Sequence, residues 1–361
     1  MLRILFIGEN WYGSNARSCA EGLRRLGCQV FDIDQRTFFP QVRLLSSRLV
    51  TRFLRFKLVD EFNRHILSEA DKFRPDIVIT MKGMFIRANT LQSLRDKGIA
   101  LYNYFPDTSA FTDGKMLQQS LPEYDCIFHT KPFWYSDATK YLTLRAGYFL
   151  PHGYNPHLHH PVELDARDIS DYRCDVSFIA IHSRYKEKLL DGLVSLRPDL
   201  DLCIWGNGWT DRCESIRLRR CIKGFGLLGE RFVRAIQASR INLGIMNGPR
   251  EGASSGDLTT SRSYQIPASG GFMLHQRNPE VLGLYQEGEE IACFESVAEL
   301  ADKIDYYLAR PAEREKIAQG GHARCVPAYS YDNRMSEVLS WHIEHSGTKE
   351  PQVALAKVDA F

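Results

Sequence analysis

Short apolar runs alternate with amphipathic stretches along the first 150 residues. The run LRILFIG at 2–8 is continuously apolar, as in a parallel strand buried on both faces. A helical pattern follows at 16–27 and a second strand at 28–34, which together make a strand–helix–strand unit. Further strands are predicted at 74–83, 98–107, 124–130 and 145–154. This alternation predicts a doubly wound parallel sheet.

The pattern restarts in the second half of the chain. Residues 161–173 are charged and poor in apolar side chains, so we interpret them as a linker or surface loop. Strand runs separated by helices then occur at 174–184, 200–209, 221–226, 241–246 and 270–276. The sequence therefore predicts an α/β protein with two Rossmann-like parallel-sheet domains, 1–152 and 153–330, facing across a cleft. A last helix at 332–346, within a C-terminal segment 331–361, is expected to pack back toward the first domain.

Composition narrows the class of protein. The 361 residues carry a formal net charge of +2, which gives no overall bias toward nucleic acid, so any electropositive site must be local. The nine cysteines form no C-x-x-C pair, and buried free thiols are favoured over disulfides or zinc. The N-terminus lacks the features of a signal peptide, and no run reaches the roughly 20 apolar residues of a membrane helix. We therefore predict a cytoplasmic protein.

In open α/β sheets ligands bind beyond the carboxyl ends of the strands, so the loops there hold the candidate chemistry. His182, Ser183 and Arg184 stand where a strand leads into a helix, and helix N-termini favour anions. The alternative is a capping Ser183 with a solvated Arg184. In IWGNGW at 204–209 the two glycines allow close backbone approach and a tryptophan could wall a nucleobase; the alternative is a tight turn with one core tryptophan.

The stretch SSGDLTTSRSYQIPASGGFMLHQ at 254–276 is the richest of these loops. Its first part offers the hydroxyls of Thr259, Thr260 and Ser261 beside the guanidinium of Arg262, which can grip a phosphate with two parallel hydrogen bonds. Tyr264 and Gln265 come just before a proline, so a turn is expected there. A loop that only caps a helix, followed by a turn, is the alternative.

From residue 174 onward the order of motifs resembles the CgeB-like (spore maturation protein) glycosyltransferases, which have the GT-B fold. The matching pieces are CDVSFIAIHSR, WGNGW, KGFG, SRINLGIMN, DLTTSRSYQIPASGGFMLHQ and the long run YQEGEEIACFESVAELADKIDYYLARPAEREKIAQGGHARCVPAYSYDNR. The first domain is similar more loosely, through YFPDTSAF and IFHTKPFWYSDATKYLTLRAGYFLPHGYNPHLHHP. The resemblance covers 174–334 most specifically.

This resemblance implies a UDP-, GDP- or dTDP-linked sugar donor held by the second domain, without metal or further cofactor. It implies that His182, Ser183 and Arg184 face the diphosphate. The residues that it implies near the base or lining the donor pocket are Gly206, Asn207, Trp209, Asp257, Thr259, Thr260, Arg262, Tyr264 and Gln265. Relatives usually carry Glu at Gln265 and often at Gln276, so this chain keeps a hydrogen-bonding group there without the charge.

Glycosyl transfer needs a stabilised leaving group, for which Arg184 and Arg262 are the candidates. An inverting enzyme also needs a general base on the acceptor side, whereas a retaining enzyme does not. The first domain offers Asp107 as our preferred base, then Glu9 and His129. A turn aspartate, a loop glutamate and a satisfied polar strand end are the respective alternatives.

Residues 43–57 combine an apolar stripe with arginines and a lysine and hold no acid. Such an amphipathic helix could lie on the inner face of a membrane or meet an anionic acceptor, which would make the acceptor a lipid-linked or cell-envelope glycan. A core-packed helix with a solvated basic face is the alternative.

Three other functions are alternatives to the transferase. A nucleotide-sugar epimerase of the same architecture would need acids and histidine clustered in one pocket. A non-catalytic nucleotide-sugar or glycan-binding module is suggested by Gln265. The loop GENWYGSN lacks the G-x-G-x-x-G of a dinucleotide site, which argues against an NAD oxidoreductase.

Overall fold

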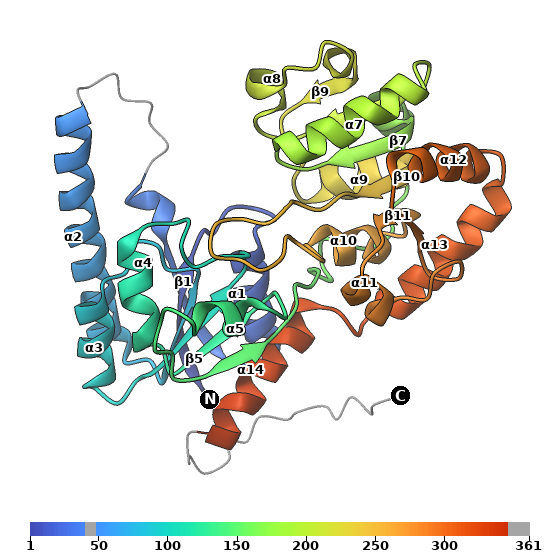
Figure 1. Ribbon diagram of the computed structural model, residues 1–361. Coiled ribbons are helices and arrows are strands. Elements are labelled where there is room, and N and C mark those ends of the chain that lie inside the picture. Colours follow the sequence, from blue (N-terminus) through green and yellow to red (C-terminus); the bar gives the residue numbers. More distant parts are fainter. Residues whose placement is uncertain (40–47, 346–361) are drawn as a thin grey trace. The chain divides into compact units, whose positions relative to one another are not determined.

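The computed structural model describes residues 1–39 and 48–345, and it divides into two compact units (Figure 1). Unit 1 comprises Met1–Pro151, the short segment Arg250–Ser254 and the chain from Tyr331 onward. Unit 2 comprises His152–Pro249 and Ser255–Ser330. Each unit has its own parallel sheet and its own core on both faces of that sheet.

The sheet of unit 1 has six parallel strands in the order β2-β1-β3-β4-β5-β6. Its strands are β1 (Arg3–Gly8), β2 (Gln29–Asp34), β3 (Ile77–Met81), β4 (Ala100–Phe105), β5 (Cys126–His129) and β6 (Gly147–Phe149). Its helices are α1 (Asn15–Arg25), η1 (Gln35–Thr37), α2 (Arg48–Phe73), α3 (Ala88–Arg95), α4 (Lys115–Ser120), η2 (Leu121–Glu123), α5 (Trp134–Ala138) and α14 (Tyr331–His345). The continuously apolar runs predicted to be buried strands form β1 and β3.

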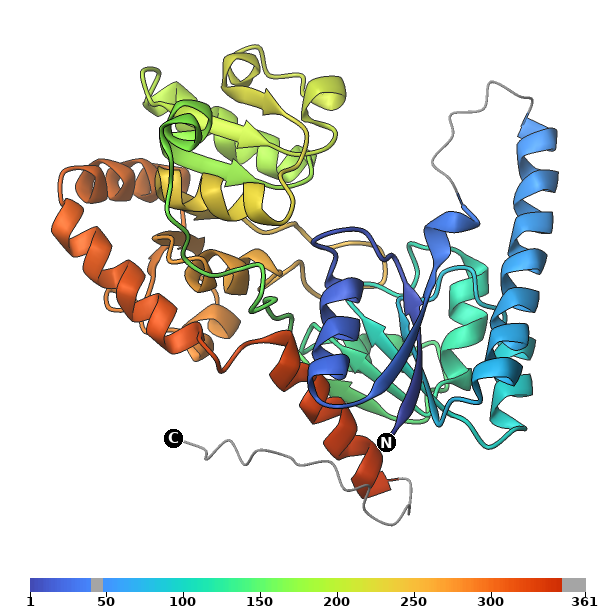
Figure 2. The ribbon, with the colours of Figure 1, turned by 180° about the vertical axis from the view of Figure 1, so that it is seen from behind.

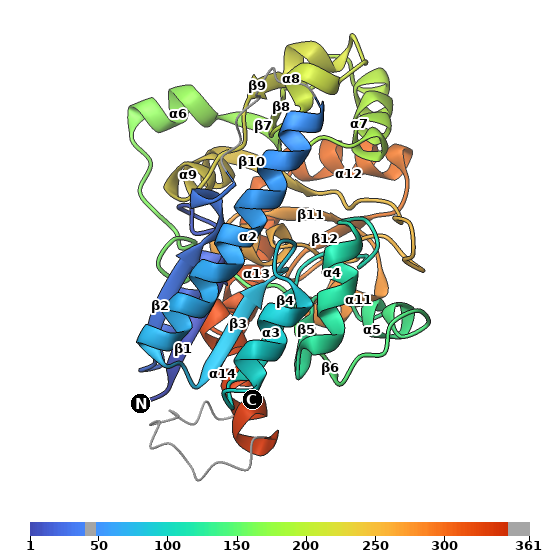
Figure 3. The same cartoon turned by 90° about the vertical axis from the view of Figure 1, so that its left-hand side faces the viewer.

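Helices cover both faces of this sheet. Figure 3 shows α2 running along one face, where Phe62 and Ile66 pack against Leu5 and Val78. Figure 2 shows α1 and α14 side by side on the other face, where Met335 belongs to the core. The C-terminal helix is thus part of the core of unit 1, although some 180 residues of unit 2 precede it in the chain.

Segment Arg250–Ser254 belongs to unit 1, although both of its neighbours in the chain belong to unit 2. Ser109 Oγ donates a hydrogen bond to the carbonyl of Glu251 (2.5 Å), and the N–H of Ser254 donates to Asp137 Oδ2 (2.6 Å). Gly252 has φ +75°, and a Cβ there would lie 2.4 Å from the ring of Phe111. The segment is therefore anchored to unit 1 through its backbone atoms, and these contacts do not depend on which side chains it carries.

The sheet of unit 2 also has six parallel strands, in the order β12-β11-β10-β7-β8-β9. Its strands are β7 (Cys174–Ile179), β8 (Leu202–Trp205), β9 (Ile222–Gly224), β10 (Ser239–Gly244), β11 (Met273–Gln276) and β12 (Ala292–Phe294). Its helices are α6 (Ala166–Tyr172), α7 (Arg184–Leu196), α8 (Trp209–Arg212), η3 (Leu218–Cys221), α9 (Glu230–Ala238), α10 (Arg262–Ala268), α11 (Pro279–Leu284), α12 (Val297–Leu308) and α13 (Pro311–Cys325).

Two helical layers enclose the sheet of unit 2. The core on one face joins Leu190 of α7 and Ile304 of α12 to strand residues such as Phe178. The core on the other face joins Ile236 of α9 and Ile266 of α10 to the sheet. The prediction of two doubly wound parallel sheets is confirmed.

Two local predictions are wrong. The turn expected before Pro267 is part of the helix α10, which begins at Arg262 and contains the proline. Proline has no N–H, so the carbonyl of Ser263 loses its usual helical donor, and the hydroxyl of Tyr285 donates to it instead (3.0 Å). In the predicted linker at 161–173, residues Ala166–Tyr172 form α6, which is started by a capping box between Asp165 and Asp168.

Other predictions concern thiols and membranes. None of the nine cysteines, all of which lie in the described ranges, forms a disulfide, and eight of them are buried, whereas Cys213 is partly exposed. In the two described ranges, no helix combines the length and the apolar character that crossing a membrane requires. The predicted basic stretch at 43–57 lies mostly outside the described residues, because 40–47 and the side chains of 48–54 are not among them.

Replacing Tyr285 with Phe should destabilise unit 2 by roughly 1–3 kcal/mol, because the buried carbonyl of Ser263 would lose its donor. Tyr141 is 71% exposed, and its replacement with Phe should change the free energy of unfolding by less than about 0.5 kcal/mol. Urea unfolding of both variants measures the difference. Equal midpoints for the two variants would contradict this account of the proline in α10.

Candidate functional site

The strand order of unit 2 creates a point where loops diverge. From β7 the chain proceeds to β8 and β9 on one side, and β10 to β12 lie on the other side. The loops after β7 and β10 therefore leave neighbouring strands toward opposite layers of helices. Ligands of open α/β sheets bind at such a switch point. All of the sequence-predicted donor residues lie in unit 2, on the loops or helices that follow β7, β8 and β10.

The loops after β7 and β8 are joined by close backbone contact. Gly206 has φ +155°, and a Cβ there would lie 1.8 Å from the carbonyl oxygen of Ala180. The same carbonyl accepts the indole N–H of Trp209 (2.8 Å), and the N–H of His182 donates to the carbonyl of Asn207 (2.9 Å). Trp209 is fully buried, so its ring belongs to the core and presents no surface on which a base could stack.

His182 supports this loop and is turned away from solvent. Its Nε2 lies 2.7 Å from Glu187 Oε2, and its side chain is only 5% exposed. Glu187 also accepts the N–H groups of Glu214 and Ser215 (2.7 and 2.8 Å). Burial raises the pKa of Glu187, but the hydrogen bonds from His182 and the backbone outweigh it and leave the pKa below its usual range. The imidazole expected to face a diphosphate instead fixes the start of α7.

Ser183 and Arg184 occupy the predicted position at the start of α7. Ser183 is the N-cap, and its Oγ accepts the N–H of Lys186 (3.4 Å). The guanidinium of Arg184 is mostly exposed and pairs with Glu214, and it also lies 3.8 Å from Glu187. The capping alternative therefore describes these two residues well, because the charge of Arg184 is already matched by two carboxylates.

The loop between β10 and α10 is closed at its neck by two residues. The N–H of Asp257 donates to the carbonyl of Asn247 (3.0 Å), and Asn247 Nδ2 donates to Asp257 Oδ2 (2.9 Å). Gly256 passes so near that a Cβ there would lie 2.2 Å from the same carbonyl. Asp257 therefore holds the loop in shape beside Arg262, whose charge it partly balances.

Arg262 brings its guanidinium to the switch point. Its Nη2 donates to the carbonyl of Ile245, just beyond β10 (2.9 Å), and its Cζ lies 5.7 Å from the ring centroid of Phe178 on β7. Burial lowers the pKa of Arg262 to about 10, against the opposing effect of Asp257. Its buried Nε finds no hydrogen-bond partner in the part of the chain that the structure describes.

The two threonines before Arg262 have opposite environments. Thr259 is fully buried, and its Oγ1 donates to Glu280 Oε1 (2.5 Å) and lies 3.4 Å from the hydroxyl of Tyr264. Thr260 also has a buried Oγ1, but this hydroxyl has no partner within residues 1–39 and 48–345. Buried polar atoms without a partner are rare in proteins. Thr260 and Arg262 thus hold polar atoms that a ligand could satisfy.

Tyr264 and Gln265 lie on α10 in different positions. Tyr264 is fully buried, and its ring packs edge-on against Tyr329, so its side chain serves the core. Gln265 is half-buried and follows Arg262 by three residues, which places both on the same side of the helix. Of the pair expected to face the donor, only Gln265 retains exposed surface.

Gln276 and Tyr185 join the ends of β11 and α7. Gln276 Nε2 donates to the hydroxyl of Tyr185 (2.5 Å), and its Oε1 accepts the N–H of Met246 (3.1 Å). An amide can donate and accept at once, whereas an ionised glutamate at this position could only accept. Sequence reasoning missed Tyr185, although it directly follows the predicted Arg184 at the same helix start.

The ring of His275 lies beneath Arg262 and is fully buried. Its Nδ1 is 2.7 Å from the carbonyl of Gln276 and must donate to it, so Nε2 accepts from Ser263 Oγ (2.9 Å). Burial, with the charge of Arg262 adding to it, lowers the pKa of His275 to about 4. The imidazole is therefore neutral and leaves Arg262 as the positive group there.

The three candidate bases lie in unit 1 and differ in access. His129 is 4% exposed, burial lowers its pKa to about 4, and its Nδ1 is engaged by the carbonyl of Lys131 (2.8 Å). Glu9 accepts hydrogen bonds from Trp11 Nε1 and Gln35 Nε2 (3.1 and 3.2 Å). Asp107 follows β4 and is 30% exposed. His129 therefore matches the alternative of a satisfied polar strand end, while Asp107 remains accessible.

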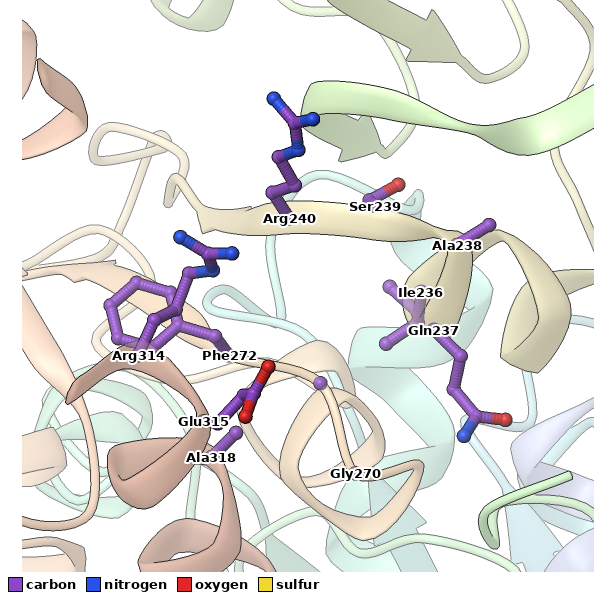
Figure 4. A pocket seen from close by; sticks show the side chains of 11 residues that line it. Ile236, Gln237, Ala238, Ser239, Arg240, Gly270, Phe272, Arg314, Glu315 and Ala318 are labelled. Atoms are coloured by element: carbon purple, nitrogen blue, oxygen red, sulfur yellow. The ribbon is translucent and has the colours of Figure 1, made fainter. Parts of the chain in front are cut away.

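A separate cavity lies at the opposite edge of the unit 2 sheet (Figure 4). Its volume is about 230 Å³, and its walls include Arg240 at the start of β10, Gly271 and Phe272 just before β11, and Arg314 of α13. Burial and the charge of Arg240 lower the pKa of Arg314. Because this cavity is at the amino ends of the strands, we do not assign it to the donor.

In the described residues, no group of three or more His, Cys, Asp or Glu side chains is arranged to hold a metal ion. The polar groups of the switch point are instead a guanidinium, hydroxyls and amides. This donor set suits an anion or a hydroxylated ligand.

Replacing Gly206 with Ala should destabilise unit 2 by more than about 2 kcal/mol, because the new methyl group would collide with the carbonyl of Ala180 at a positive φ. The matched control is Gly283→Ala in α11, where a Cβ meets nothing within 4 Å and helix propensity improves. Thermal unfolding should show a lowered Tm for G206A and an unchanged or raised Tm for G283A. A G206A protein as stable as the G283A protein would contradict the described contact.

Part of the chain matches the sequence model of a known family. Residues 184–340 match the sequence model of the family described as Glycosyl transferase-like. This match includes the start of α7, the loop before α10 and α14. No curated protein matches the sequence.

Solved structures share the fold across almost the whole chain. Sucrose-phosphate synthase from Thermosynechococcus elongatus has 14% identity and a TM-score of 0.68, over 95% of this chain and 99% of its own. HepE from Anabaena in complex with UDP-glucose has 12% identity and a TM-score of 0.63, over 94% and 100%. The UDP-GlcNAc 2-epimerase from Neisseria meningitidis bound to UDP-GlcNAc has 10% identity and a TM-score of 0.53, over 95% and 100%. The chain thus has the two-domain α/β fold called GT-B, with a glycosyl transferase-like segment over 184–340.

Proposed function

We propose that the protein is a glycosyltransferase whose unit 2 binds a nucleotide-sugar donor at the switch point between β7 and β10. The observation that carries this proposal is the unpartnered polar pair there: the buried Nε of Arg262 and the buried hydroxyl of Thr260, both counted over the described residues. A diphosphate accepts from a guanidinium and from a hydroxyl, so it would satisfy both. The family match over 184–340 supports the same assignment.

In this proposal Arg262 stabilises the leaving group. When the bond between the sugar C1 and the diphosphate oxygen breaks, its electron pair stays on the diphosphate and adds negative charge. A guanidinium already held in place by Ile245 and Phe178 meets that charge without rearranging. Because Arg262 supplies a fixed positive charge, the proposed mechanism requires no metal ion. Arg184 would contribute only if it left Glu214.

The finer assignments follow from the motifs and the neighbours. The order of motifs supports a CgeB-like enzyme that transfers a hexosyl or deoxyhexosyl group. The UDP-glucose complex of HepE makes UDP the first nucleotide to test. We assign the acceptor to unit 1, with a lipid-linked or cell-envelope glycan as its class. Membrane contact through 43–57 remains a prediction from the basic pattern alone.

A nucleotide-sugar epimerase is the second candidate, because the Neisseria epimerase shares the fold at a TM-score of 0.53. The two activities give different products from a donor alone. An epimerase returns a nucleotide sugar of altered configuration, whereas a transferase supplied with water as acceptor releases free sugar and nucleoside diphosphate. Proton NMR of the donor during incubation distinguishes these products, and a protein that binds the donor but changes nothing would be a binding module.

The first experiment is a thermal-shift screen with UDP-, GDP-, dTDP- and CMP-sugars. A ligand present at 100 times its Kd should add about 2.7 kcal/mol of stability to the folded protein, which is well above detection. We expect at least one nucleotide sugar to raise the Tm. If none does, the proposed function is wrong.

Replacing Arg262 with Ala should weaken donor binding by roughly 10–100-fold, because a charge-assisted hydrogen bond is lost. Arg262→Lys should recover only part of the affinity, since it keeps the charge but loses the planar fork. Arg231→Ala on α9 is the control, because this arginine lies on the surface of unit 2 and bonds the hydroxyl of Tyr172. Calorimetric titration with the best donor of the screen measures all three, and unchanged affinity in R262A would refute the placement of the diphosphate.

The neighbouring threonines should respond in opposite ways to replacement with Val. Thr260→Val removes a hydroxyl without a described partner, so stability should stay equal or rise while donor affinity falls roughly 3–10-fold. Thr259→Val breaks the bond to Glu280 in the core and should cost about 1–3 kcal/mol of stability. Denaturant unfolding together with donor titration tests the pair. A T260V protein that is destabilised but binds donor normally would show a structural role for this hydroxyl.

A further inference from the structure

A second charged cluster lies at the carboxyl end of the unit 1 sheet. Lys82 directly follows β3, and Asp107 comes two residues after the neighbouring strand β4. Lys82 Nζ is 2.6 Å from Asp107 Oδ2 and 3.0 Å from Asp113 Oδ1. The side chains of Lys82, Asp107 and Asp113 are 24, 30 and 19% exposed, so the cluster is shielded but still reached by solvent.

The backbone at Lys82 is held in an unusual conformation. Its φ is +66°, in the left-handed region that side chains with a Cβ rarely adopt. The N–H of Gly83 bonds the carbonyl of Met81 (2.8 Å), which makes a tight turn centred on Lys82. Asn103 Nδ2 donates to the carbonyl of Lys82 (3.0 Å) and to Thr80 Oγ1 (2.8 Å). A glycine would adopt this turn without strain, so the lysine is present for its side chain.

The two carboxylates come from one loop, residues 106–114, which is fixed at several points. Thr130 Oγ1 donates to the carbonyl of Pro106 (2.9 Å), and Ser109 Oγ donates to the carbonyl of Glu251 (2.5 Å). Glu251 thus meets the loop through its backbone. On the side of β5, His129 is neutral because burial lowers its pKa to about 4, and its Nδ1 bonds the carbonyl of Lys131. Among the described residues, Asp107 and Asp113 form ion pairs with the same ammonium, that of Lys82.

One ammonium shared by two carboxylates gives a balanced environment. Burial alone would lower the pKa of Lys82, but Asp107 and Asp113 outweigh it and raise the pKa. The ammonium in turn lies within ion-pair distance of both carboxylates. Asp107 thus shares its cation with Asp113, and 30% of its side chain stays exposed.

We propose that Lys82 is a positioning residue that aims and ionises Asp107 as the general base of an inverting transfer, with Asp113 tuning its strength. This inference rests on the proposed function. In the step, the acceptor hydroxyl gives its proton to the Asp107 carboxylate, and its oxygen forms the new bond to C1. The bond from C1 to the diphosphate breaks with its electron pair on the diphosphate, so the configuration at C1 inverts.

The decisive test is the pH dependence of kcat in two variants with opposite expectations. Removing the cation in Lys82→Met makes the Asp107 carboxylate easier to protonate. The acid limb, meaning the fall of kcat on the acidic side of its pH profile, should therefore move up by about one pH unit. Removing the second anion in Asp113→Asn leaves Lys82 wholly to Asp107, so the acid limb should move down. The assay is hydrolysis of the best donor from the thermal-shift screen, with water as acceptor.

Further variants separate positioning from structure. Asp107→Asn should lower kcat by about 10²–10⁴-fold with little change in KM. Lys82→Gly should raise the Tm by relieving the positive φ, yet lower kcat at neutral pH like K82M. Lys82→Arg should restore the acid limb to near the wild-type position. Lys97→Met breaks a surface pair with Asp71 in the same unit and should change neither rate nor limb.

The outcomes distinguish this inference from the proposed function. If no nucleotide sugar binds the wild type, the function itself fails. If the donor binds equally to wild type and K82M but the acid limb stays in place in K82M and D113N, the positioning role is refuted while the function stands. Two further outcomes would overturn the assignment of Asp107. One is a wild-type protein that binds the donor but does not hydrolyse it. The other is a released sugar that NMR shows to have retained its configuration at C1.

Discussion

The arrangement of unit 2 depends on one partly buried cation. A guanidinium is costly to bury unless its donors and its charge are matched. Arg262 meets that cost with the carbonyl beyond β10, the ring of Phe178 on β7 and the nearby Asp257. These partners lie on β7, just beyond the end of β10, and in the loop that leads to α10. The position of the cation therefore requires the strand order, the closed neck at Asn247 and Asp257, and the start of α10 together.

Unit 1 uses the opposite arrangement at the same edge of its own sheet. There a cation is fixed by a strained turn and is outnumbered by carboxylates, whereas in unit 2 a cation keeps spare donors. One cluster is suited to receive a proton and the other to receive an anion. An inverting glycosyl transfer releases a proton and an anionic leaving group, and our two proposals assign one of these to each cluster.

Much of the fold could be predicted from sequence, because buried parallel strands read as unbroken apolar runs and their helices as amphipathic ones. Loops after such strands often carry function, which singled out Arg262; the structure places it at the start of α10, and its role toward a donor stays a prediction. The helix around Pro267 could not be predicted, because it depends on a hydroxyl from Tyr285, some twenty residues away. Neither could the pairing of Arg184 with Glu214, nor the burial of Trp209, which are set by long-range packing. Lys82 escaped notice because a positive φ is usually marked by glycine.

The place of α14 has a consequence for how the chain matures on the ribosome. Met335 and its neighbours on this helix fill the core on one face of a sheet whose first strand is β1. Synthesis proceeds from the N-terminus, so that face of unit 1 stays uncovered while all of unit 2 is made. The unit that begins first is therefore completed last, and its nascent form presents apolar surface for most of translation. Chaperone dependence during synthesis would follow from this order of the chain rather than from low final stability.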